Sequence, residues 1–185
     1  AEFSGFIDTG SFLLNAAFSG SLFGGIADNK VFGLAGENST GKTFFTLGIV
    51  KRFLEDNPTG GVIYYDTESA ITKGMMSSQG IDVNRVIISE PDTIQKFRTQ
   101  ALKTLEIYQA QPEKTRPRLM MVLDSLGMLS TTKEVEDTQE GKETRDMTKA
   151  QIIKAAFRAL TLKLAKATIP LIITNHTYAV AGAWK

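Results

Sequence analysis

The chain has no cysteine, one histidine and one tryptophan in 185 residues. Without cysteine it can form neither a disulfide nor a thiolate zinc site, which fits a reducing compartment such as the cytoplasm.

The charges of its 21 Lys and Arg residues nearly cancel those of its 20 Asp and Glu residues. The net charge of +1 therefore gives no reason to expect a nucleic acid or a membrane surface as partner. No apolar run approaches the roughly 20 residues that span a bilayer, and the first residues lack the basic region of a secretory signal.

A glycine-rich motif is the most informative feature that is present. It fits the pattern G-x-x-x-x-G-K-[ST] at every fixed position. Its residues are Gly36, Glu37, Asn38, Ser39, Thr40, Gly41, Lys42 and Thr43. Such loops turn backbone N–H groups toward phosphates, and the helix that follows adds a favourable dipole. The motif predicts a nucleoside-triphosphate site in which Lys42 reaches the β- and γ-phosphates and Thr43 ligates Mg²⁺. A helix cap with incidental glycines is the bland alternative.

Strand-like and helix-like segments alternate along the whole chain. The apolar runs predict strands at 31–35, 61–66, 84–89, 118–125 and 170–175, and the helical periodicity predicts helices at 42–55, 92–110 and 147–166. Nearly uninterrupted apolar strands are typical of a parallel sheet buried on both faces. We therefore predict an α/β fold, a doubly wound parallel sheet with helices on both faces. Polar residues that follow the strands should meet at the carboxyl-end rim, where such sheets bind ligands.

Three side chains at predicted strand ends are candidates for chemistry. Asp124 closes an apolar strand and could hold Mg²⁺ opposite Thr43, although strand-end aspartates also cap turns. Glu68 could orient the attacking water, or it could be a solvated loop carboxylate. His176, the only histidine, follows Asn175 and could sense the γ-phosphate, whereas lone histidines more often serve packing.

The stretch 131–149 is highly polar and only weakly periodic. From Lys133 to Lys149 it holds six acidic and four basic residues, which is a poor balance for tracking phosphates. We expect a mobile, solvated loop here. Nothing in its composition indicates DNA binding.

The motifs together resemble the RecA-type recombinases, and among them the phage UvsX branch. The resemblance runs from about residue 7 to about residue 180 and keeps the order of the motifs. It rests on 36–43, on Tyr65-Asp66-Thr67-Glu68, on Leu123-Asp124-Ser125-Leu126, on Ile173-Thr174-Asn175-His176-Thr177-Tyr178, and on the lead-in Ile7-Asp8-Thr9-Gly10-Ser11. It implies a RecA-like P-loop NTPase, a DNA-dependent ATPase that uses ATP and Mg²⁺ and assembles as a helical filament on single-stranded DNA for strand exchange in recombination and repair.

The resemblance also assigns roles to single residues. Glu68 falls on the catalytic glutamate, His176 on the γ-phosphate sensor, and Thr67 beside the nucleotide. Residues 1–185 would be one ATPase core, with a lead-in segment at 1–30, a first DNA loop at 131–147 and the start of a second at 177–185. Arg145 and Lys149 are the candidates for phosphate contact.

Several expectations concern the rest of the protein. We expect a chain truncated at both ends, cytoplasmic, with a recombination mediator as a further partner and no membrane contact. Three alternatives stay open: a hexameric helicase or clock-type ATPase with the same core, a nucleotide-binding module without turnover, and, more remotely, a small-molecule kinase.

Overall fold

A computed structural model describes residues 5–140 and 148–177 of the chain. Its main sheet has five strands in the order β3-β7-β6-β4-β5, and every ladder is parallel. The strands are β3 (Val31–Gly36), β4 (Gly61–Asp66), β5 (Val86–Ser89), β6 (Leu119–Asp124) and β7 (Leu171–His176). Each predicted strand is confirmed to within one or two residues. The third strand starts at Val86 because a 3₁₀ turn occupies Val83–Arg85.

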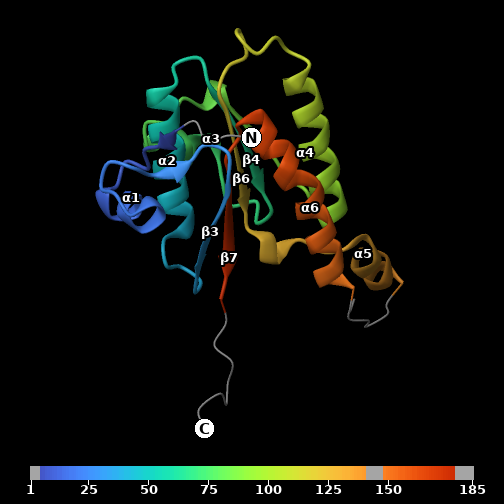
Figure 1. The fold of residues 1–185 in the computed structure, drawn as a ribbon. Coiled ribbons are helices and arrows are strands. Elements are labelled where there is room, and N and C mark those ends of the chain that lie inside the picture. The colour runs from blue at the N-terminus through green and yellow to red at the C-terminus, as the bar shows by residue number, and fades with distance from the viewer. Residues whose placement is uncertain (1–4, 141–147, 178–185) are drawn as a thin grey trace.

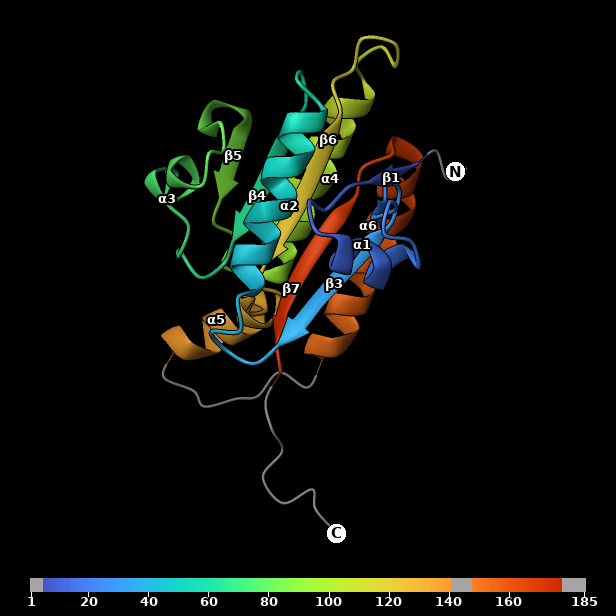
Figure 2. The ribbon, with the colours of Figure 1, turned by 90° about the vertical axis from the view of Figure 1, so that its left-hand side faces the viewer.

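Helices cover both faces of this sheet, as predicted (Figure 1). One face carries α1 (Phe12–Ser19), α2 (Lys42–Asp56) and α3 (Lys73–Ser78), and the other carries α4 (Ile94–Gln109) and α6 (Lys149–Ala167). Figure 2, viewed from the side of α1 and α2, places α4 and α6 behind the strands. In the lead-in segment, β1 (Phe6–Ile7) and β2 (Ile26–Ala27) form a separate antiparallel pair.

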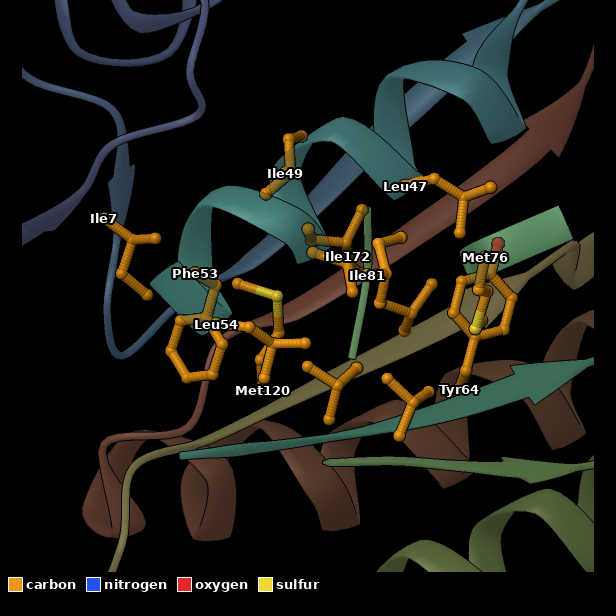
Figure 3. Packing of buried hydrophobic residues seen from close by; sticks show 14 of the residues in the cluster. Ile7, Leu47, Ile49, Phe53, Leu54, Tyr64, Met76, Ile81, Met120 and Ile172 are labelled. Carbon is orange, nitrogen blue, oxygen red and sulfur yellow. The ribbon is translucent and has the colours of Figure 1, made fainter. Parts of the chain in front are cut away.

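Two apolar layers hold the sheet between the helices. Alternate residues of each strand face opposite layers, since the side-chain period of a strand is two. The layer under α2 includes Leu47, Phe53, Tyr64, Met120 and Ile172, and Figure 3 shows such side chains filling the space between α2 and the strands. The other layer joins α4 and α6 to the sheet through buried residues that include Tyr65, Phe97 and Leu160. The carboxyl ends of the strands are left free to carry the polar rim.

The expectation of a loop over 131–149 was wrong for its first half. Residues Thr132–Gln139 form helix α5. The Thr131 hydroxyl accepts a hydrogen bond from the Glu134 backbone N–H, and the Glu134 carboxylate accepts one from the Thr131 N–H. This capping box satisfies two N–H groups that a helix start otherwise leaves unpaired, so a polar segment becomes a helix without burying an apolar face. Arg145 lies outside the described residues.

None of the helices in the described parts of the chain is long and apolar enough to span a bilayer.

Candidate nucleotide site

The phosphate-loop motif connects β3 to α2. Gly41 stands directly before the helix with φ of +86°, a backbone conformation that residues with a side chain rarely adopt. At Gly36 a Cβ would lie 2.9 Å from the Thr40 hydroxyl oxygen, so a side chain there would require this hydroxyl to shift. The backbone geometry of the loop therefore requires glycine at position 41, and the space beside Thr40 favours it at position 36.

Lys42 points back into this loop from the first turn of α2. Its Nζ donates to the carbonyl oxygens of Gly36 at 2.9 Å and Glu37 at 2.6 Å, and the residue is buried. The ammonium is thus held at the concave side of the loop. A cation there, together with N–H groups at a helix N-terminus, suits a polyphosphate.

Thr43 and Asp124 meet at the rim from different elements. The Thr43 hydroxyl donates to Asp124 Oδ2 at 2.8 Å, which joins the start of α2 to the end of β6. One hydroxyl and one carboxylate are the hard oxygen donors that Mg²⁺ accepts when it also binds substrate phosphates. Among the described residues no cluster of three or more metal-ligating side chains is found, and the pair fits this sparse kind of magnesium site.

Two further hydroxyls hold Asp124, and sequence inspection missed both. Tyr64 donates to Oδ2 at 2.7 Å, and Thr174 donates to Oδ1. Burial, followed by the charge of Asp124, raises the pKa of Tyr64, so the phenol stays protonated and donates. Asp124 is only 5% exposed. A buried carboxylate surrounded by fixed donors keeps one orientation.

Glu68 lies at the same rim, beyond the end of β4. Its Oε1 accepts a hydrogen bond from the Ser125 hydroxyl at 2.8 Å and lies 2.6 Å from His176 Nε2. Partial burial by itself would raise the pKa of Glu68, but hydrogen bonds from His176 and Ser125, with the charges of His176 and Lys42, outweigh it and lower the pKa. Glu68 is therefore a carboxylate at neutral pH.

The loop that carries Glu68 is shaped by its neighbours Asp66 and Thr67. Buried Asp66 accepts hydrogen bonds from the backbone N–H groups of Glu68 at 3.1 Å and Ile71 at 2.8 Å. The Thr67 hydroxyl donates to the Ser125 carbonyl at 2.7 Å and accepts from the Ser125 N–H at 2.8 Å. Thr67 thus ties this loop to the end of β6, and its contact with nucleotide stays a prediction.

The four candidate side chains Thr43, Asp124, Glu68 and His176 converge on one rim, as the order of strands and helices predicted. Lys149, in contrast, lies at the start of α6 and forms an ion pair with Glu134 at 3.3 Å. That contact links α6 to the cap of α5. The role predicted for Lys149 in DNA binding stays a prediction.

A parallel sheet with a phosphate loop at one strand end and a carboxylate at the end of another defines a P-loop nucleotide-binding domain. The RecA N-terminal domain matches residues 4–183. The chain belongs to that family, which confirms the resemblance noted in its motifs.

Two relatives illustrate the match. The chain is 32% identical over 166 residues to a recombination and repair protein of Enterobacteria phage T4, an alignment that covers 90% of this chain and 41% of that protein. It is 29% identical over 171 residues to the RecA protein of Sulfurimonas denitrificans, covering 92% of this chain and 45% of that protein. The chain thus spans less than half of the length of these relatives.

Proposed function

We propose that this chain is the ATP-binding and ATP-hydrolysing core of a DNA recombinase. The observation that carries the proposal is the meeting of the Thr43–Asp124 pair and the Glu68–His176 pair beyond one phosphate loop. Membership in the RecA N-terminal domain family and the name of the phage relative support recombination and repair as its setting.

In this proposal each side chain has one task. Backbone N–H groups of 36–41 and the Lys42 ammonium bind the phosphates, while Thr43 and Asp124 hold Mg²⁺. The metal ion, when bound, neutralises charge that develops on the transferred phosphoryl group. The Glu68 carboxylate accepts a hydrogen bond from the attacking water and orients it in line with the phosphate.

His176 would report which nucleotide is bound. Its Nε2 shares a hydrogen bond with Glu68, and rotation of either side chain would allow the imidazole to donate to a γ-phosphate instead. Because His176 ends β7 and the chain continues from it, a change of partner at this ring is coupled to the segment 177–185. We place the start of a second DNA loop there and the first DNA-binding region at 131–147, of which Thr132–Gln139 is helix α5, with Arg145 and Lys149 as phosphate contacts.

The whole protein would then bind single-stranded DNA, assemble as a filament of this chain and use a mediator. Residues 1–185 are proposed to form one ATPase core in the cytoplasm. A RecA-fold helicase differs in assembly, so electron microscopy with ATP and single-stranded DNA separates rings from filaments.

Steady-state ATP hydrolysis with Mg²⁺, with and without single-stranded DNA, tests the core of the proposal. We expect DNA to stimulate turnover and Glu68→Gln to lower it by about 10²- to 10⁴-fold, the usual contribution of a positioned general base. Binding of a fluorescent ATP analogue should survive in Glu68→Gln. Tight binding with no turnover in either protein would instead indicate a nucleotide-binding module, and absence of binding would refute the proposal.

A further inference from the structure

The near-zero net charge of the chain conceals a strong separation of charge. Helices α4 and α6 together hold eight basic residues and one acidic residue. Since the chain has 21 basic and 20 acidic residues in all, 13 basic and 19 acidic residues remain for everything else. The residues concerned are Lys96, Arg98, Lys103, Lys149, Lys154, Arg158, Lys163 and Lys166, with Glu106 as the acid. One helical layer is thus strongly positive and the remainder negative.

Most of the basic residues of this layer form no ion pair with another described residue. Lys96 pairs with Asp92 and Lys149 with Glu134, whereas the other six form no ion pair within residues 5–140 and 148–177. The opposite layer is built differently. There, Lys51 pairs with Glu55, and Arg52 pairs with both Asp8 and Asp56. Two helical layers on one sheet therefore follow different charge patterns.

Helix stability does not explain the pattern on α6. Lys154 and Arg158 are four residues apart and Lys163 and Lys166 are three apart, so each pair brings like charges together and weakens the helix. Lys166 alone benefits from the dipole at the helix end. A bound polyanion would relieve this repulsion.

A groove between the two helices gathers part of this charge. It has a volume of about 490 Å³. Its lining consists of Arg98, Thr99, Leu102, Lys103 and Glu106 from α4 with Ala159 and Lys163 from α6. Figure 1 shows α4 and α6 side by side on one face, away from α2. The groove presents three cations, a hydroxyl and one carboxylate, and its lining contains no aromatic side chain.

We propose that this basic groove binds the phosphate backbone of double-stranded DNA, separately from the rim that binds nucleotide. Exposed cations favour a polyphosphate through release of its counterions, and the Thr99 hydroxyl adds a hydrogen-bond donor. Single strands are usually held by bases stacked on aromatic rings, which this lining lacks. Duplex DNA also carries the denser row of phosphates. The inference does not depend on ATP turnover.

Anisotropy of a short labelled DNA duplex, without nucleotide and over about 50–200 mM salt, tests the groove. The variant Lys103→Gln/Lys163→Gln removes two exposed lysines from the groove, and Lys30→Gln/Lys114→Gln removes two exposed lysines elsewhere. Removing one lysine that binds a phosphate should reduce the slope of log K against log salt by about 1, so the slope of the groove variant should fall by about 2. The control should retain the wild-type slope. ATP hydrolysis should be unchanged in both.

Three further variants sharpen the result. Glu106→Gln removes the single acid of the groove and should tighten duplex binding, an effect that mere damage to the fold would not produce.

Because the chain has no cysteine, Thr99→Cys can carry a single fluorophore in the groove and Lys114→Cys one outside it. Duplex DNA should change the emission of the first label only.

Several outcomes would overturn the inference. Equally weakened binding in the two double variants would show that only net charge matters. If the groove variant weakened binding of a labelled single strand only, or if the wild type bound no duplex, then duplex DNA would not be the partner of the groove. Competition by polyglutamate as effective as that by duplex DNA would assign the groove to an acidic protein.

Discussion

Asp124 and Glu68 occupy the same rim but are built in opposite ways. Asp124 is 5% exposed and accepts hydrogen bonds from three neutral hydroxyls, those of Thr43, Tyr64 and Thr174. The Glu68 side chain is 32% exposed and has His176 and Ser125 as partners. The Asp124 carboxylate is held by side chains from two strands and a helix, whereas Glu68 lies on a loop.

This difference suits two different tasks. A metal ligand needs one geometry in every state, which burial and several fixed donors supply. A group that orients water must be reachable and able to exchange partners, so partial exposure and a rotatable imidazole are appropriate. The contrast predicts that substitutions at the two carboxylates affect different measurements.

The largest contrast should appear between Asp124→Asn and Glu68→Gln. Removing the charge of Asp124, a proposed metal ligand, should lower the apparent Mg²⁺ affinity of the nucleotide complex by more than about 100-fold, the upper range for loss of a mere outer-shell partner. Glu68→Gln should leave that affinity unchanged and lower turnover by about 10²- to 10⁴-fold. Titration of Mg²⁺ against fluorescent-nucleotide binding measures the first effect independently of hydrolysis.

The assignment of the two carboxylates would be wrong if the variants exchanged these phenotypes. Nucleotide binding in EDTA is the control, because neither carboxylate belongs to the backbone N–H groups and the Lys42 ammonium that are proposed to bind the phosphates. Both variants should bind there as the wild type does.

Tyr64→Phe should have the next largest effect. It deletes one donor to Asp124 and leaves the ring in the core, so the carboxylate loses part of its orientation. We expect the apparent Mg²⁺ affinity to fall by about 10-fold, the lower range for an outer-shell partner. The same titration measures it.

Tyr65→Phe is the matched control for that experiment. Tyr65 is the next residue of β4 and is equally buried, but it faces the other layer, where its ring packs against Phe97 at 5.0 Å. Its loss should not change Mg²⁺ dependence. Equal effects of the two substitutions on the apparent Mg²⁺ affinity would show that Tyr64 serves packing and does not orient Asp124.

This pair of tyrosines also marks a limit of prediction from sequence. The run Gly61–Asp66 identified a buried strand correctly, and the alternation of a strand places neighbouring tyrosines on opposite faces. Which face lies under α2 depends on how β4 pairs with β6 and β5. Tyr64 becomes a partner of Asp124 through this register, and Thr174 through the pairing of β6 with β7, so no local pattern could identify them.

Other features were available in the sequence and were missed. Thr131-Thr132-Lys133-Glu134 fits the capping-box pattern that starts α5, but the polar composition suggested a loop. The charge separation between α4/α6 and the rest of the chain can be counted residue by residue, yet the net charge of +1 concealed it. A net charge summed over the whole chain does not show how the charges are distributed among its helices.

Ser125→Ala should produce the smallest effect, on the Glu68 side of the comparison. The Ser125 hydroxyl is one of the donors that lower the pKa of Glu68, so its removal should raise that pKa. The acidic limb of kcat/KM for ATP should then move to higher pH, since Glu68 must be ionised to accept a proton. Ser78→Ala, at an exposed serine of α3, should leave the profile unchanged.

Thermal unfolding gives an independent test of the same bond. A carboxyl whose pKa is lower in the folded state stabilises the protein above its unfolded-state pKa and loses that contribution as pH falls through the folded-state value. Ser125→Ala should therefore lower Tm relative to wild type at neutral pH, and the part of this difference that comes from ionised Glu68 should disappear below the pKa of Glu68. A difference that stays constant across that pH range would show that Ser125 supports the fold without acting on Glu68.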